Sequence, residues 1–409
     1  MTHEIKKSIE QYAKHCIEWQ RKLVGIPALA PEADGTGEWE KAEFVLSLLE
    51  ELSITDIEIL PSPDDRVPRG DRPNIIARIP GQKQGPVIWI MAHLDVVPAG
   101  DLSLWESDPF ELQVKGDELI GRGVEDNHQG LVSALLAIKA LRENNVLPYL
   151  PIGLAIVADE ENGSKHGLQY LMQNHRGQFS DDDLIIVPDA GDNEGLCIEI
   201  AEKSILWIKF KISGKQCHAS TPDLGVNAHR AAAYLTVELE KLHDIFNHRD
   251  ELFDPPLSTF EPTRKESNVP NINTIPASDI FYLDCRILPD YSLDDVIAAI
   301  DKMIFDIEQR FNVRVEKSFP QKVTAAPPTR QDTAVVKRLS KAIKAVLGKE
   351  ARLIGIGGGT VASFFREEGL ATAVWSTIVD TGHMPNELSL ISNTLQDAQV
   401  FAHLFTQQE

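Results

Sequence analysis

Short apolar runs that alternate with amphipathic stretches constrain the fold of this chain most strongly. The run at 86–92 (PVIWIMA) is continuously apolar, which is typical of a central strand covered on both faces. Residues 151–158 and 183–188 contain further short apolar runs, residues 74–80 also predict a strand, and residues 130–144 have the spacing of a strong amphipathic helix. We therefore predict an α/β fold with a mostly parallel sheet that carries helices on both faces.

The middle of the chain follows a different pattern. Apolar and polar residues alternate there, as they do in half-exposed antiparallel strands, and two long helices interrupt the alternation. The predicted strands are 205–215, 279–289, 313–319 and one within 256–276, and the predicted helices are 226–246 and 292–311. This order is that of a β-α-β-β-α-β module, so we expect a ferredoxin-like α/β domain at 204–321. It would be inserted into a discontinuous domain formed by 1–203 and 322–409.

The composition argues against several classes of partner. The 409 residues include 62 acidic and 40 basic ones, a formal net charge of −22, which disfavours binding to nucleic acid or to anionic membranes. No apolar run reaches about 18 residues, so no membrane span is expected. Residues 5–24 have the spacing of a helix and contain no apolar signal-peptide core, and residues 40–52 have the spacing of a second helix. We expect a cytoplasmic protein whose four cysteines are free thiols, because no CxxC pair occurs.

Metal-capable side chains follow four of the predicted strands. They are His93 and Asp95, then the trio Asp159, Glu160 and Glu161, then Asp189, and finally Asp380 and His383. Ligands of open α/β sheets bind outside the carboxyl ends of the strands, so these side chains are predicted to meet at one edge. Asp126 precedes the helix at 130–144, where the helix N-terminus favours a carboxylate.

Each of these residues has a simpler interpretation when it is taken alone. Asp126 could be a helix N-cap, Asp189 a turn residue, and His93 a structural histidine. Their shared position at one sheet edge favours a metal site instead. Two histidines and three carboxylates are too many for one catalytic zinc, and they suit two ions roughly 3.5–4 Å apart that share a carboxylate. Zn²⁺ is expected, with Co²⁺ or Mn²⁺ as alternatives.

Eight motifs connect the chain to a known family. In chain order they are MAHLDVVP, GRGVEDNHQG, ADEENGS, VPDAG, GKQCHAS, NTIP, GGGT and GHMPNE. Over essentially its whole length the sequence resembles the two-metal family of aminoacylase, acetylornithine deacetylase, succinyl-diaminopimelate desuccinylase and carboxypeptidase G. This resemblance implies a zinc-peptidase-like catalytic domain with an inserted dimerisation or lid domain, and a homodimer.

The resemblance also implies a role for each residue at the sheet edge. The metal ligands would be His93, Asp126, Glu161, Asp189 and His383, with Asp126 as the bridge. Glu160 would be the general base, and Asp95 would orient His93. Glu125 could be mistaken for the bridge, but the motif position favours Asp126. Asp159 is expected to be a supporting residue.

The chain departs from the family's usual pattern directly after Asp126. A hydrophobic residue and a lysine often follow the bridging aspartate in the family, whereas this chain has Asn127 and His128. His128 is a candidate for an extra ligand, but a surface or supporting position is favoured.

Substrate contacts are implied at five further positions. His218 matches a histidine that reaches the partner subunit's active site and helps to hold the developing oxyanion. Asn273 and Arg286 match residues that bind the substrate or its carboxylate. Gly359 and Thr360 would offer backbone amides and a hydroxyl to a substrate carboxylate. Without the resemblance, His218 would be interpreted as a turn residue and Arg286 as a surface residue.

These inferences predict an amidohydrolase that cleaves the amide bond of an N-acyl amino acid through a metal-bound hydroxide, as a desuccinylase or deacetylase does. A dipeptidase or carboxypeptidase of the same family is the alternative. A non-catalytic binding protein on the same fold is a third possibility, which the intact ligand set and Glu160 disfavour. The expected partner is a small-molecule N-acyl amino acid or dipeptide.

Overall fold

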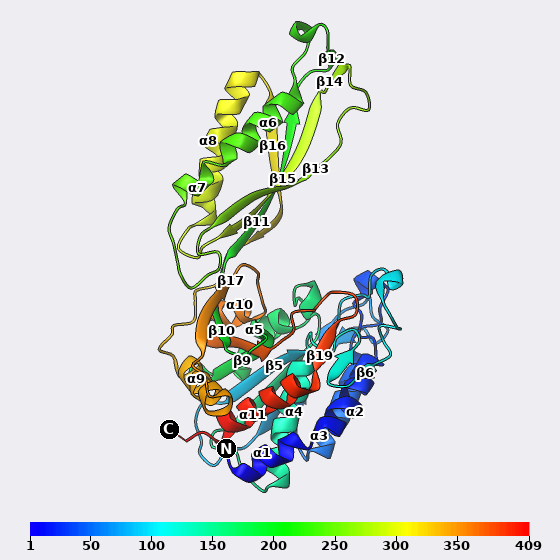
Figure 1. The fold of residues 1–409 in the computed structure, drawn as a ribbon, viewed down its shortest axis with the longest axis vertical. Coiled ribbons are helices and arrows are strands. Elements are labelled where there is room, and N and C mark those ends of the chain that lie inside the picture. The colour runs from blue at the N-terminus through cyan, green and yellow to red at the C-terminus, as the bar shows by residue number, and fades with distance from the viewer. Residues whose placement is uncertain (409) are drawn as a thin grey trace. The chain divides into compact units, whose positions relative to one another are not determined.

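The protein, described by a computed structural model over residues 1–408, divides into two units, which are drawn in Figure 1. The larger unit comprises Met1–Ile200, Thr329–Ile354 and the chain from Thr360 onward, and the smaller comprises Ala201–Pro328 and Gly355–Gly359. The smaller unit is larger than the predicted inserted domain, 204–321, because it also contains residues 201–203, 322–328 and 355–359. Residues 355–359 are joined to it by the N–H of Gly355, which donates to the carbonyl of Leu252 at 2.6 Å.

An eight-stranded sheet forms the centre of the larger unit. Its order is β1 (Asp56–Ile59), β4 (Ile75–Ile79), β8 (Ile152–Val157), β5 (Ile88–His93), β9 (Leu184–Asp192), β18 (Thr372–Thr377), β10 (Cys197–Glu202) and β17 (Arg352–Ile356). The four strands from β8 to β18 are parallel to one another, whereas β1 and β4 on one side and β10 on the other pair antiparallel. The sheet is thus parallel at its centre and antiparallel toward its margins.

Helices cover both faces of this sheet, as predicted. Helix α4 (His128–Glu143) packs on β5 and β9 and against α11 (Ile391–Thr406), which itself contacts α9 (Ala334–Leu347). Helices α5 (Leu168–His175) and α10 (Ala362–Glu367) join a separate core cluster with Trp89 and Val187 of the strands. Strands β5 and β8 are buried along their whole length, which explains their uninterrupted apolar sequences.

The helix predicted at 5–24 is two helices in the structure. They are α1 (His3–Glu10) and α2 (Ala13–Val24), and α3 (Trp39–Glu51) follows them. The N–H of Gln11 and of Tyr12 each bond the carbonyl three residues earlier, which tightens the chain into a turn. Tyr12 is buried there, and its hydroxyl donates to Glu143 of α4. The tertiary contact therefore breaks a pattern that looked continuous.

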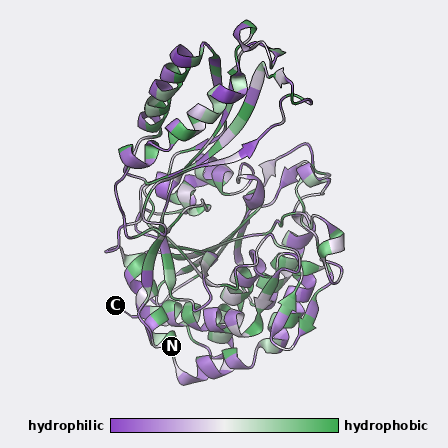
Figure 2. Cartoon of the chain, turned by 45° about the horizontal axis from the view of Figure 1, so that its top comes forward, coloured by the Kyte–Doolittle hydropathy of each residue, from purple (hydrophilic) through white to green (hydrophobic). Residues whose placement is uncertain are grey.

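The smaller unit has the predicted β-α-β-β-α-β order. Its strands are β11 (Ser204–Ser213), β13 (Thr259–Lys265), β15 (Ser278–Ile287) and β16 (Arg314–Val323), in the all-antiparallel order β13-β15-β11-β16. Helices α6 (Ala228–Leu239) and α8 (Leu293–Phe311) pack with the strands in one core. Burial alternates along β15, as a sheet with one covered face requires. Figure 2 shows hydrophilic and hydrophobic residues alternating along the helices.

The helix predicted at 226–246 is also shorter than expected. It ends at Leu239 and is followed by the short helix α7 (Leu242–Ile245), because Glu240 and Lys241 form i→i−3 hydrogen bonds. The remaining strands are β2 (Ser62–Pro63), β3 (Asp71–Arg72), β6 (Gln113–Lys115), β7 (Glu118–Ile120), β12 (Cys217–His218), β14 (Thr274–Ile275) and β19 (Leu388–Leu390).

Two further expectations concern the chain as a whole. Cys16, Cys197 and Cys285 are buried free thiols, and Cys217 is a half-buried one. Among residues 1–408, none of the helices combines the length and the apolar character that a membrane crossing requires.

Candidate metal centre

Four of the five predicted ligands come from the four parallel strands or from the segments that follow them, and Asp126 precedes α4. His93 is the last residue of β5, Glu161 lies just beyond β8, and His383 follows β18. Asp189 lies within β9, where the register against β18 shifts between Val374 and Ser376. A bulge of this kind changes the direction in which a strand side chain points. Parallel strands in adjacent positions thus bring these residues to one edge of the sheet.

The predicted ligands form two groups of three that share Asp126. One group is His93, Asp126 and Asp189, and the other is Asp126, Glu161 and His383. The two oxygens of Asp126 face different groups: Oδ1 lies 3.0 Å from His93 Nε2, and Oδ2 lies 3.1 Å from His383 Nε2. This is the arrangement that a bridging carboxylate needs.

The distances within each group complete this picture. His93 Nε2 lies 3.5 Å from Asp189 Oδ1, and His383 Nε2 lies 3.0 Å from Glu161 Oε2. Asp126, Asp189 and His383 also line a cavity of about 240 Å³, together with Asp380. Asp380 therefore faces the site without belonging to either group of three.

The electrostatics of the site are those of carboxylates gathered around imidazoles. Hydrogen bonds with Asp126 and Glu161 raise the pKa of His383 to about 10. Burial by itself would lower the pKa of His93, but bonds with Asp126, Asp189 and Asp95 raise it well above its usual range. Burial disfavours the ionised form of Asp126, whereas hydrogen bonds with His383 and His93 favour it. The net result is that the pKa of Asp126 lies below its usual range. Each imidazole thus compensates negative charge as a cation would.

The donor set fits two divalent ions. Glu161 Oε1 is buried and has no hydrogen-bond partner among residues 1–408, which is costly unless a cation meets it. The Nδ1 atom of His93 lies 3.0 Å from the carbonyl oxygen of Asp95. If Nδ1 carries the proton and donates to that oxygen, the Nε2 lone pair is directed toward Asp126 and Asp189, where it could bind an ion.

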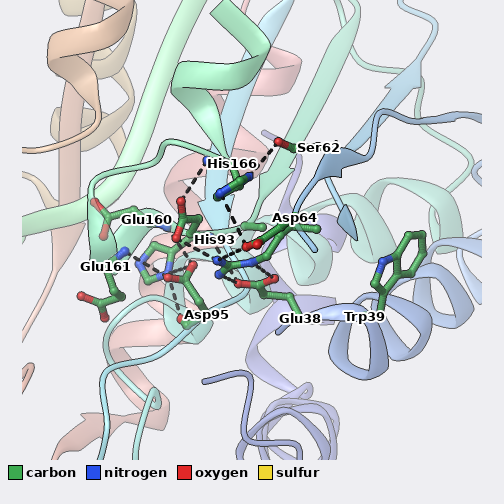
Figure 3. A network of polar contacts seen from close by, with 12 residues as sticks. Glu38, Trp39, Ser62, Asp64, His93, Asp95, Glu160, Glu161 and His166 are labelled. Carbon is green, nitrogen blue, oxygen red and sulfur yellow. Dashed lines mark hydrogen bonds and ion pairs between the residues drawn. The ribbon is translucent and has the colours of Figure 1, made fainter. Parts of the chain in front are cut away.

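Asp95 acts on more than His93. Its carboxylate lies 3.6 Å from His93 Nδ1, so the closer contact to this nitrogen is the Asp95 backbone. The two carboxylate oxygens instead accept the N–H of Glu160 and of Glu161, each at 3.0 Å. Figure 3 shows Asp95 close to His93 and to this pair of glutamates. Asp95 therefore positions the turn that carries Glu160 and Glu161 as well as the predicted ligand His93.

Glu160 lies beside the ligands without belonging to either group of three. Burial raises its pKa well above the usual range of a carboxyl group, and the nearby carboxylates of Asp189 and Glu161 raise it further, against the opposing influence of His93. A carboxylate with a raised pKa accepts a proton readily. This environment suits the predicted role of general base.

Asp159 has a defined structural role that the sequence did not reveal. It adopts a left-handed conformation (φ 60°) between β8 and the 3₁₀ turn Glu160–Asn162, which ends the strand alternation. Its carboxylate accepts from Arg72 Nη1 at 2.9 Å and from the N–H of His166 at 2.9 Å. Arg72 also binds Glu38, and all three side chains of this ion-pair cluster are buried.

Glu125 and Glu387 hold the backbone around the site, a role that the sequence analysis did not predict. Glu125 belongs to neither ligand group and accepts from the N–H groups of residues 379–382, including Thr381 at 2.6 Å and Gly382 at 3.1 Å. Glu387 accepts from the N–H of Gly123 at 2.9 Å and of Asp126 at 3.1 Å. Only the unusual run of carboxylates near the ligands hinted at these roles.

His128 is buried, so the expectation that it could be a surface residue is wrong. Its Nε2 lies 2.8 Å from the ammonium of Lys41, and it belongs to neither ligand group. Asn127 is buried too, and its side-chain amide donates to Asp189 Oδ1 at 2.8 Å. Asn127 thereby holds a ligand in place.

The smaller unit carries most of the predicted substrate residues. His218 is exposed at the end of β12, opposite Thr274 of β14, and its Nδ1 lies 2.7 Å from the Ser220 hydroxyl. The carbonyl of Asn273 accepts from the N–H of Ala219 at 2.9 Å. His218 and Asn273 thus belong to one exposed two-stranded element.

Arg286 is less available than predicted. Its guanidinium donates to Asp284 Oδ1 at 2.7 Å and Oδ2 at 3.1 Å, and to the carbonyl of Gly357 at 2.9 Å. Gly359 is exposed in the same glycine-rich segment, and the Thr360 hydroxyl accepts from the N–H of Ala362 at 3.2 Å. A substrate carboxylate would have to displace Asp284 to receive both arms of Arg286.

Several known proteins are similar to this chain. The sequence profile described as peptidase family M20/M25/M40 matches residues 89–407. An uncharacterized metallohydrolase of Methanococcus maripaludis is 43% identical over 404 residues, which cover 94% of this chain and 97% of the relative. A succinyl-diaminopimelate desuccinylase of Pseudomonas syringae is 25% identical over 318 residues, 76% of this chain and 80% of that enzyme.

Solved structures share the fold at lower sequence identity. Human carnosine dipeptidase 1 has a TM-score of 0.73 and 17% identity, with 98% of this chain and 97% of that chain covered. Aminopeptidase PepT from Bacillus cereus has a TM-score of 0.75 and 18% identity, with 96% and 98% covered.

Proposed function

Because this chain belongs to peptidase family M20/M25/M40, and is therefore a metallohydrolase that acts on amide bonds, we propose that it removes the acyl group from an N-acyl amino acid. The observation that carries the proposal is the sharing of Asp126 between the two ligand groups. The desuccinylase relative supports a deacylase, and the family also includes peptidases, so a dipeptide is the alternative substrate.

Five residues would hold the two ions, which we expect to be zinc. They are His93, Asp126 and Asp189 for one ion, and Asp126, Glu161 and His383 for the other. Two such ions would polarise the amide carbonyl and make a water more acidic. Asp95 and Asn127 would keep the ligands and the glutamate turn oriented through the contacts described above.

Glu160 would move the proton. It would accept a proton from the attacking water and deliver it to the nitrogen of the departing amine, which is the work of a general base that becomes a general acid. Its raised pKa fits it to hold that proton between the two steps.

The substrate would be held by residues of the smaller unit and of the glycine-rich segment. His218 would hold the developing oxyanion, from a partner subunit in a homodimer, and Asn273, Arg286, Gly359 and Thr360 would bind the substrate or its carboxylate. This part of the proposal rests on the motif positions.

The test is a hydrolysis panel with the full-length protein loaded with zinc, cobalt or manganese. It should contain N-succinyl and N-acetyl amino acids beside dipeptides. We expect cleavage of at least one N-acyl amino acid, and cleavage of dipeptides alone would favour the alternative. The Asp126→Asn variant should lose both ions and all activity, whereas Asp101→Asn, at an exposed aspartate outside the site, should keep both.

A further inference from the structure

Asp159 is a buried aspartate in an uncommon backbone conformation, directly before the two glutamates of the candidate metal centre. Strand β8 ends at Val157, and Asp159 has φ 60° and ψ 23°, which lie in the left-handed region. Residues with a side chain seldom occupy this region, although aspartate and asparagine do so more readily than most. The conformation costs free energy and persists only where surrounding contacts maintain it. The contacts of Asp159 therefore decide whether the chain turns at this point.

The side chain and the carbonyl of Asp159 hold the loop after β8 closed. One carboxylate oxygen accepts from Arg72 Nη1 at 2.9 Å, and the other accepts the N–H of His166 at 2.9 Å. The carbonyl accepts the N–H of Ser164 at 2.6 Å. Asp159 is 3% exposed and Arg72 is fully buried, so their ion pair is sheltered from water, where a charged hydrogen bond is strong. The carboxylate thus joins residue 159 to residue 166 and anchors both to Arg72 of β3.

The turn that Asp159 begins determines how the next two residues are presented. The two oxygens of Asp95 accept the successive N–H groups of Glu160 and Glu161, each at 3.0 Å. One carboxylate can do this only at a turn, because successive N–H groups of an extended strand point in opposite directions. In this turn Glu161 Oε2 lies 3.0 Å from His383 Nε2, while Glu160 belongs to neither ligand group. The division of roles between the two glutamates therefore depends on the conformation of the residue before them.

We propose that Asp159, anchored by Arg72, is a positioning residue that sets the turn at 160–161, so that Glu161 binds an ion and Glu160 is left to move a proton. The proposal rests on the proposed function, because it assumes that Glu161 binds metal and that Glu160 transfers a proton. Asp159 would touch neither ion nor substrate and would act through the backbone. It would fix the start of the turn, and Asp95 would bind the N–H groups of the turn.

The central variant is Asp159→Gly. Glycine adopts the left-handed conformation without steric cost, so the backbone can still turn, but the variant has no carboxylate for Arg72 or for the N–H of His166. Arg72 keeps a counterion, because its Nε donates to Glu38 at 2.7 Å. Asp159→Asn is the conservative variant, since asparagine tolerates the same conformation and keeps one acceptor oxygen.

Asp64→Asn is the matched control. Asp64 is also buried and lies beside the same guanidinium, with its Oδ2 3.8 Å from Arg72 Nη1, but its closer ion pair is with Arg66 at 2.8 Å. It also lies 3.5 Å from the ring of His166, which is outside the turn Glu160–Asn162. Loss of the Asp64 carboxylate therefore disturbs the same ion-pair cluster but leaves Asp159 with both of its side-chain partners.

The readouts are zinc affinity of the full-length protein, measured against a competing chelator, and kcat at saturating zinc on a substrate from the hydrolysis panel. Asp159→Gly should weaken the ion of the group Asp126, Glu161 and His383 by about tenfold or more and leave the other ion little changed. At saturating zinc, kcat should still fall by about tenfold or more, because Glu160 is displaced as well. Asp159→Asn should show smaller but measurable losses. Asp64→Asn should lower the melting temperature and leave zinc affinity and kcat unchanged.

A merely structural aspartate would affect stability alone. Wild-type zinc affinity and kcat in Asp159→Gly would overturn the proposal, and so would an equal loss in Asp64→Asn. Weakening of both ions by the same factor would overturn it too, because the turn carries a ligand of one ion only. If Asp159→Gly did not fold, wild-type zinc affinity and kcat in Asp159→Asn would decide against the proposal. A wild type that binds no zinc and cleaves nothing in the panel would instead remove the proposed function, so the two failures are distinguishable.

Discussion

Glu125 and Glu387 each hold the backbone of the segment from which the other comes. The Glu125 carboxylate accepts the N–H groups of residues 379–382, directly before His383, and the Glu387 carboxylate accepts those of residues 123, 125 and 126. Asp126 and His383, two of the three residues of the second ligand group, therefore sit on segments that are fastened to one another. His383 itself has a positive φ of 64°, a conformation that the surrounding contacts must maintain.

We expect Glu125→Gln to weaken the site that contains His383 more than the site that contains His93. An amide has one acceptor oxygen and no charge, so it cannot hold the N–H groups of 379–382 as the carboxylate does. Zinc titration should show one ion bound about tenfold or more weakly, with the other little changed. Glu111→Gln, at an exposed glutamate, is the control. Equal weakening of both ions would contradict a role confined to this loop.

Glu160→Gln tests the proton-transfer role directly. The amide fills the same space but cannot take a proton, so kcat should fall by about 10²–10⁴-fold. Because Glu160 belongs to neither ligand group, both ions should stay bound when metal content is measured on the same sample. Near wild-type turnover, or loss of an ion, would show that the assignment is wrong.

The cluster of Glu38, Arg72 and Asp159 should matter for stability. Arg72→Met leaves two buried carboxylates without their cation, and breaking a buried pair in this way costs about 3–5 kcal/mol of unfolding free energy. Arg330→Met removes only an exposed pair with Asp332, which contributes little to stability. Urea denaturation of both variants measures the difference. If Arg72→Met lowered the unfolding free energy only slightly, Glu38 and Asp159 would have to become protonated when the cation is removed.

Mild acid should destabilise the protein through His403. Burial, together with the smaller effect of the positive charges of the N-terminal amine and of Lys341, lowers the pKa of His403 from 6.5 to about 4. The unfolded chain therefore binds a proton more readily than the folded protein between these values. The contribution of His403 to stability is complete above pH 6.5 and is lost as the pH falls toward 4.

His403→Gln should accordingly make the unfolding free energy less dependent on pH between 7 and 5. The comparison is with wild type and with His3→Gln, at an exposed histidine, in urea titrations at both pH values. If the variant lost as much stability as the wild type on acidification, the effect would have to come from other groups.

Much of the fold, and the sheet edge at which the predicted ligands meet, could be predicted from the sequence for a local reason. Strands buried on both faces need continuous apolar runs, and residues 86–92 and 151–158 fall within or around β5 and β8. In a parallel sheet the carboxyl ends of adjacent strands share an edge, so the order of His93, Glu161 and His383 along the chain already implied their meeting. The breaks at Gln11 and Glu240 escaped detection because tertiary contacts and turn geometry, which periodicity does not record, produce them.

The roles of neighbouring carboxylates were decided only by the tertiary structure. Glu125 and Asp126 are adjacent and chemically alike, yet one binds backbone 254 to 257 residues away and the other joins two ligand groups. The same holds for the three adjacent carboxylates at 159–161. Asp159 pairs with Arg72, Glu161 lies beside His383, and Glu160 is left for the predicted proton transfer. The sequence by itself determined which side chains reach the sheet edge, because strand periodicity is local. Their partners come from distant segments, as Lys41 does for His128, and only folding brings these together.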